Sequence, residues 1–247
     1  RVSVDAATRQ RTREQIERIG HRLHELGALP GAISEPSTHE LFEATYPLHP
    51  VSLVLLPSLA QKVAQNERTI FSYLGGHEPH GFLDTVSRLV KTEPSQPWVR
   101  PCHIFDYFVV SQAGLLTDPL THRRWAEVVT ALERLGDAPA LQVELLKTIG
   151  LFNLARVRGG LKASPEILQL CFEHDLDELT TAFAVLQQRS VITYQKFSGE
   201  YRVWQGSDFD IEEALSRERS QMGEIALPDV LNHRKVLGPL VARRYSI

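Results

Sequence analysis

The spacing of apolar residues near the start of the chain predicts one long amphipathic helix over residues 5–27. The apolar positions recur at steps of three and four residues, at Ile16, Ile19, Leu23 and Leu26. Arginine and glutamate side chains fill most of the remaining positions, as expected for a helix with one buried face. Gly27 and Pro30 are typical of the end of such a helix.

The same periodicity predicts a series of shorter helices along the next hundred residues. They are expected at 38–45, 50–63, 66–74, 80–92, 102–113 and 121–135. Asn66 is a favourable N-cap for the third of them. Between the fourth and the fifth, Pro94, Pro97 and Pro101 indicate an extended segment.

After Pro139 the pattern predicts three helices and then two strands. The stripes are Leu141, Leu145, Ile149 and Phe152 for the first helix and Leu176, Leu179, Phe183 and Leu186 for the third. Ser164 and Pro165 are typical of the start of the second helix. Residues 191–196 and 201–204 are rich in strand formers and flank a Ser-Gly turn, which predicts a β-hairpin. Three helices followed by a hairpin is the order of a winged helix, and further helices are expected over 209–222 and from residue 227.

Composition is that of a soluble globular chain. It has 247 residues, of which 43% are hydrophobic and 23% charged, and the net charge is −3. This balance gives no general attraction to nucleic acid or to an anionic membrane. The longest apolar run, 51–60, is about half the length that spans a bilayer. Cys102 and Cys171 have no metal-site spacing and form no disulfide framework, so we expect a cytoplasmic protein with no metal and no disulfide. Since no apolar run spans a bilayer, we also expect no membrane contact.

Both ends of the sequence lead us to expect a longer protein. Residue 1 is arginine, and Met222 is the single methionine. Residues 239–247 have an apolar and basic helical pattern that stops without a cap or a glycine. We therefore expect both termini to lie within a larger polypeptide.

A winged helix raises the question of DNA binding, and the charges of this region oppose it. Residues 139–215 contain seven basic and eleven acidic residues. The third helix opens with Glu173, Asp175, Asp177 and Glu178, where a groove-reading helix would meet phosphates. The candidate nucleic-acid contacts are therefore restricted to the hairpin and its base, at Arg189, Lys196 and Arg202. A protein contact or a structural role is the favoured alternative.

The remaining polar motifs favour structural roles over catalysis. His77-Glu-Pro-His80 lacks the spacing of a helix-borne zinc site, and Pro79 prevents a regular helix through it. His49, between Leu48 and Pro50, is expected to form a capping or core hydrogen bond. Ser207 or Asp208 is expected to cap the following helix, which makes acid–base work by Asp208 and Asp210 the weaker interpretation.

Three segments resemble a known family. They are Tyr46-Pro-Leu-His-Pro50 through Leu74, Tyr201-Arg-Val-Trp204 with Gly206-Ser-Asp-Phe-Asp210, and Val241-Ala-Arg-Arg-Tyr-Ser246. These segments resemble large bacterial P-loop ATPases that are similar to origin-recognition AAA+ proteins, many of them in phage-defence systems. In that architecture a helical lid and a winged helix follow the ATPase core. The present chain contains no Gly-x-x-x-x-Gly-Lys-Ser/Thr loop, so it lacks the means to cradle phosphates in that way.

The resemblance implies a nucleotide-sensing role for Arg68. A guanidinium can grip phosphate oxygens with two donors, and AAA+ proteins use an arginine of this kind to sense the γ-phosphate. The alternative is a structural arginine near a helix start capped by Asn66. ATP and magnesium would belong to the parent ATPase, and this chain is expected to hold no cofactor and no catalytic residue of its own.

The sequence therefore predicts a mainly α protein, with a helical lid-like bundle followed by a winged-helix domain with a small β-hairpin. The expected parts are an N-terminal long helix (1–30), a lid-like domain (31–136), a winged-helix domain (137–222) and a C-terminal helix (223–247) that leads into a missing segment. One function hypothesis is the non-catalytic portion of an ATPase, whose partners are the missing core or neighbouring subunits and, as a candidate, nucleic acid. The alternative is a free-standing winged-helix DNA-binding regulator with a helical sensing domain.

Overall fold

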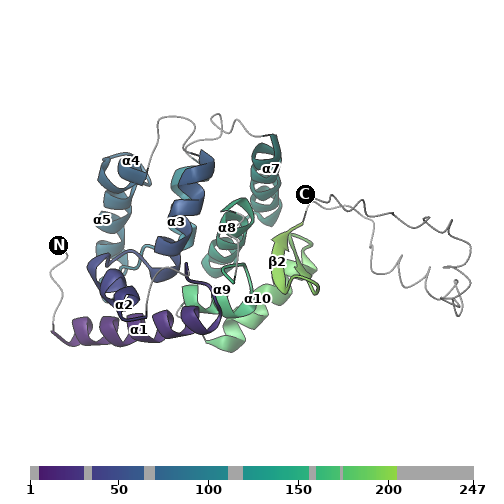
Figure 1. Cartoon of the computed structure of the whole chain (residues 1–247). Coiled ribbons are helices and arrows are strands. Elements are labelled where there is room, and N and C mark those ends of the chain that lie inside the picture. Colours follow the sequence, from purple (N-terminus) through teal and green to yellow (C-terminus); the bar gives the residue numbers. More distant parts are fainter. Residues whose placement is uncertain are drawn as a thin grey trace, which may run out of the picture. The chain divides into compact units, whose positions relative to one another are not determined.

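A computed structural model describes residues 6–30, 35–63, 70–110, 119–155, 160–172 and 175–204. In these residues the protein is mainly helical with a two-stranded antiparallel sheet, which confirms the predicted mainly α class (Figure 1). The elements are α1 (Ala6–Glu25), α2 (Glu35–Ala44), α3 (Pro50–Val63), α4 (Ile70–Gly75), α5 (Phe82–Thr92), α6 (Pro101–Phe105), the π-helix η1 (Asp106–Val110), α7 (Pro119–Leu135), α8 (Ala140–Ala155), α9 (Pro165–Cys171), α10 (Leu176–Gln188), β1 (Ile192–Gln195) and β2 (Glu200–Val203).

The long helix α1 has the buried face and the C-terminal stop that its sequence predicts. Ile16, Ile19 and Leu23 are buried in the core. Gly27 has a positive φ of 61°, a conformation that glycine adopts without steric cost. The amide of Ala28 donates to the Leu23 carbonyl at 2.9 Å, and the amide of Gly27 donates to the His24 carbonyl at 2.9 Å. This pair of bonds is a Schellman cap, which satisfies carbonyls that the helix itself leaves open.

The residues around His49 join the extended segment that the prolines predict. Leu48 and Val99 form a parallel β-bridge. The amide of His49 donates to the Val99 carbonyl at 3.1 Å, and the Val99 amide donates to the Pro47 carbonyl at 2.8 Å. Trp98 is fully buried beside this bridge and its indole N–H donates to Gln15 on α1 at 3.0 Å. The extended segment before α6 thus contacts both α1, through Trp98, and the 47–49 residues that lead into α3.

The helix predicted over 102–113 differs from the structure. A short α-helix, α6, continues directly into the π-helix η1 within the described residues. Two ion pairs bind this region to α8: Lys147 Nζ lies 2.7 Å from Asp106 Oδ1, and Arg100 Nη1 lies 3.7 Å from Glu144 Oε2. Apolar periodicity does not distinguish an α-turn from a π-turn, so the change of hydrogen-bond pattern is not readable from the sequence.

Helix α8 is the centre of the core. Its buried residues lie all around the helix, as expected for a helix with neighbours on every side. Figure 1 shows α8 between α3 and α7. It contacts α3, α6 and α7 as well as α9, α10 and β2. One hydrophobic cluster therefore extends from α1 through α8 to the hairpin. The division at residues 136 and 137 into two domains stays a prediction.

The last part of the described chain has the predicted order of three helices and a hairpin. Ser164 caps α9 by accepting a hydrogen bond from the Ile167 amide at 3.4 Å, with Pro165 in the first turn, as predicted. In α10, Leu179, Phe183 and Leu186 are buried. The spacing predicts Leu176 in the same stripe, but Leu176 is 60% exposed because it stands in the first turn of the helix, ahead of the packed face.

Candidate nucleic-acid interface

The hairpin is built on a short antiparallel ladder. Ile192 pairs with Val203 at one end and Gln195 pairs with Glu200 at the other. On the side facing α10, the Phe183 and Tyr201 rings are stacked with centroids 4.6 Å apart and an interplanar angle of 5°. An aromatic stack of this kind adds to the free energy of burial. The sheet is therefore held against α10 by its own aromatic side chain.

The outer edge of β2 is covered by groups from α8 and from the connection after it. The Tyr201 amide donates to the Ala163 carbonyl at 2.8 Å. Asn153 of α8 donates through Nδ2 to the Tyr201 carbonyl at 3.2 Å and accepts from the Val203 amide at 2.9 Å. An edge strand otherwise presents amides and carbonyls without partners. Asn153 and Ala163 form hydrogen bonds with these groups of β2, as a third strand would.

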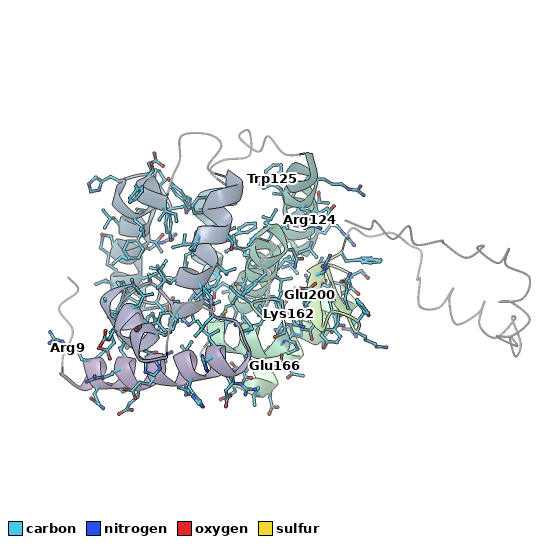
Figure 2. All side chains as sticks on the ribbon, in the orientation of Figure 1. Arg9, Arg124, Trp125, Lys162, Glu166 and Glu200 are labelled. Carbon is cyan, nitrogen blue, oxygen red and sulfur yellow. The ribbon has the colours of Figure 1, made fainter. Side chains whose placement is uncertain are left out.

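Asn153 is the residue that the sequence interpretation overlooked. It stands in an apolar helix, after Gly150-Leu-Phe, and a carboxamide in such a setting needs hydrogen-bond partners. A lone carboxamide in an apolar helix is the sequence signal that indicates such a hydrogen-bonding role. Its own carbonyl also accepts a hydrogen bond from Arg124 Nη1 of α7 at 3.1 Å, and Figure 2 labels Arg124 on that helix. Asn153 thus connects α7, α8 and β2.

Replacing Asn153 with alanine is expected to lower the free energy of unfolding by roughly 2–3 kcal/mol, because two polar groups of β2 lose their partner. Urea unfolding followed by circular dichroism measures the loss. Ser198→Ala is the matched control, since the Ser198 hydroxyl forms an exposed bond to Gln195 at 3.3 Å. We expect that control to change the free energy by less than about 0.5 kcal/mol. An equal effect of both substitutions would contradict this role for Asn153.

The three candidate cations occupy different places on and beside the hairpin. Arg189 follows α10, and its Nη1 donates to the Leu135 carbonyl at the end of α7 at 2.9 Å. Arg202 on β2 binds Glu200 Oε1 through Nη2 at 2.7 Å and Nε at 3.0 Å. Lys196 lies at the exposed turn. Arg189 and Arg202 thus have structural partners, and a nucleic-acid contact by any of the three stays a prediction.

The opening turn of α10 has the acidic character expected from the sequence. Asp175, Asp177 and Glu178 are exposed there, beside exposed Leu176. These carboxylates are favourable for the helix because its N-terminus carries partial positive charge. They are unfavourable for a phosphate backbone brought to the same turn. The acidic charge that opposes groove binding by α10 is therefore present on the surface of the folded chain.

The histidine motifs take part in the packing. Glu78 accepts a hydrogen bond from the Tyr107 hydroxyl at 2.9 Å, and the chain from residue 76 to 81 is not helical. His49 is buried, and its Nδ1 accepts from the Val51 amide at 3.2 Å, which confirms the predicted core hydrogen bond. Burial, helped by the nearby Arg100 charge, lowers the pKa of His49 to about 3.

Two candidates fall outside the part of the chain that the structure describes. They are Arg68 with its neighbour Asn66, and the Ser207, Asp208 and Asp210 group. Among the described residues there is no group of three His, Cys, Asp or Glu side chains that could hold a metal ion. None of the described helices is long and apolar enough to cross a membrane.

Comparison with known proteins gives no relative on which to base an assignment. No family model matches the sequence, and no curated protein and no solved structure is significantly similar to it.

Proposed function

We propose that this chain is the non-catalytic lid and winged-helix portion of a AAA+/P-loop ATPase, which couples the nucleotide state of the ATPase core to protein or nucleic-acid partners. The observation that carries the proposal is the order α8, α9, α10 and hairpin after a helical region, with the hairpin packed on α8 and α10. Its match to the lid and winged-helix order of the family that the sequence resembles supports this assignment. A place in bacterial phage defence follows from that resemblance alone.

Coupling requires a physical connection between the helical region before α8 and the hairpin, and α8 supplies one. Ion pairs from Asp106 and Arg100 bind α6 and η1 to one side of α8, and Asn153 on the same helix holds β2. Packed helices of this kind move as units because their interfaces resist continuous deformation. A displacement of α6 and η1 would therefore be passed to the hairpin through α8.

The proposal assigns ATP and magnesium to a core that is not in this sequence. The full open reading frame that encodes the chain is expected to contain a phosphate-binding loop upstream of residue 1. Purified full-length protein should hydrolyse ATP with magnesium, while the present chain should show no turnover above a mock purification. An open reading frame without such a loop, or turnover by this chain alone, would refute the proposal.

The free-standing regulator is the alternative, and duplex DNA separates it from the proposal. We expect no binding of a short random duplex below about 10 μM at physiological salt, because the exposed acids of α10 oppose the phosphates. Fluorescence anisotropy of a labelled duplex measures the affinity. Binding below 1 μM that weakens steeply with salt would favour the regulator.

A further inference from the structure

The tip of the hairpin carries a fully exposed phenylalanine. Phe197 lies in the turn between β1 and β2, and its relative exposure is 105%. Among the exposed large hydrophobic residues of the described ranges, Phe71 of α4 follows at 82%. A single exposed apolar side chain needs no explanation by itself. Phe197 differs because its turn is held in place by hydrogen bonds.

The turn that presents Phe197 is braced from two directions. Gly199 has a φ of 63°, and its amide donates to the Gln195 carbonyl at 2.8 Å, which closes the turn. Lys162, from the connection between α8 and α9, donates through Nζ to the Ser198 carbonyl. Figure 2 shows Lys162 next to the sheet that carries Glu200. The aromatic ring is therefore displayed on a fixed support, which reduces the entropy lost on binding.

Two lysines lie at the turn that carries this ring. Lys196 precedes Phe197 in the turn, and Lys162 places an ammonium group at Ser198. The carboxylate of Glu200, at the start of β2, is engaged by Arg202. An aromatic face beside lysine ammonium groups suits a nucleic-acid strand, because bases stack on the ring and phosphates attract the cations.

The acids of α10 restrict which nucleic acid fits. A duplex laid along the opening turn of α10 would bring phosphates to Asp175 and Asp177. An unpaired base has its faces open and needs the tip alone. We propose that Phe197 is a stacking residue for an unpaired base of single-stranded nucleic acid, with Lys196 and Lys162 beside the backbone. This inference rests on the proposed function, since it names the nucleic-acid partner of the winged-helix portion.

The test uses a dT20 oligonucleotide and the chain of residues 1–247, without nucleotide or ATPase core. Phe197→Ala is expected to weaken binding by at least about five-fold, the lower end of what one base stack contributes. Phe197→Trp is expected to retain binding, and its added fluorescence should be quenched by the oligonucleotide. The matched control Phe71→Ala should bind the oligonucleotide with wild-type affinity. The fluorescence added by Phe71→Trp should not be quenched when the oligonucleotide binds. Lys196→Gln should reduce the salt dependence of binding.

Each result decides the inference separately from the ATPase proposal, which is tested on the open reading frame and on ATP turnover. Equal affinities of wild type and Phe197→Ala would overturn it, as would quenching at position 71 equal to that at position 197. Absence of saturable binding by the wild type would also overturn the stacking role of Phe197. The exposed ring would then be left as a contact for a pocket on a protein partner. Melting curves of both alanine variants establish that they are folded.

Discussion

Phe183→Ala is expected to lower the free energy of unfolding by about 3–5 kcal/mol, the usual cost of truncating a buried phenylalanine. Phe183 is 7% exposed, lies between buried Leu179 and Leu186 in the α10 stripe, and stacks on Tyr201. Removing the ring leaves a cavity and also removes the aromatic contact that holds the hairpin. The hairpin and α10 should therefore lose stability together.

Chemical denaturation of the wild type and the variant measures this effect. Phe197→Ala is the matched control, since it removes the same ring from a fully exposed position and should change the free energy by less than about 0.5 kcal/mol. A loss below about 1 kcal/mol for Phe183→Ala would show that α10 does not present this face to the core. Near-ultraviolet circular dichroism reports whether the Tyr201 environment changes.

The helices were predictable wherever the sequence states both a face and an end. In α1 the apolar stripe gives the buried face and Gly27 gives the stop, and both agree with the structure. In α9 the Ser164 and Pro165 pair gives the start for the same reason. These signals are local, so they do not depend on which neighbours the helix later meets.

What the sequence could not supply depends on tertiary neighbours. Leu176 has the right spacing for the α10 stripe, but the core begins one turn later and leaves it exposed. The pairing of Asp106 with Lys147 needs α8 alongside, and apolar spacing does not distinguish the π-turns of η1 from α-turns. Asn153 appears as one polar residue in a helix until β2 is placed beside it. Apolar periodicity reports that a face is buried, but not which element buries it.

The places of the three candidate cations relative to the hairpin were predictable from the sequence, but the groups that they contact were not. Sequence order alone places Arg189, Lys196 and Arg202 on or beside the hairpin, at separate positions. The partners of Arg189 and Arg202, a helix-end carbonyl and a strand carboxylate, follow from the fold. The exposure of Phe197 likewise depends on the turn that carries it.

Acidification from pH 7.5 to pH 5 is expected to destabilise the protein, with two histidines contributing about 4 kcal/mol together. Burial, with repulsion from Arg100, lowers the pKa of both His49 and His103 to about 3. An unfolded histidine has a pKa near 6.5, so below that pH the unfolded chain binds protons that the folded chain does not. Stability is therefore full above about pH 6.5 and falls as the pH drops toward 3, by about 2 kcal/mol per histidine at pH 5.

The measurement compares the free energy of unfolding at the two pH values in non-titrating variants. His49→Asn keeps an acceptor for the Val51 amide. His103→Asn keeps an acceptor for the Arg100 amide, which donates a hydrogen bond to His103 Nδ1 at 3.0 Å. Each variant should lose about 2 kcal/mol of the pH-dependent difference, whatever its stability at pH 7.5. Ser198→Ala, which removes no titratable group, should keep the full difference.

The choice of pH 5 separates the histidines from the carboxylates. Hydrogen bonds lower the pKa of Glu25 and of Glu166 below the ordinary value of 4.5, so their contributions are lost only as the pH falls further. A pH-dependent difference that His49→Asn and His103→Asn leave unchanged would mean that both histidines take up protons in the folded protein. The hydrogen bonds of His49 with the Val51 amide and of His103 with the Arg100 amide would then have to open, because a protonated ring nitrogen accepts no hydrogen bond.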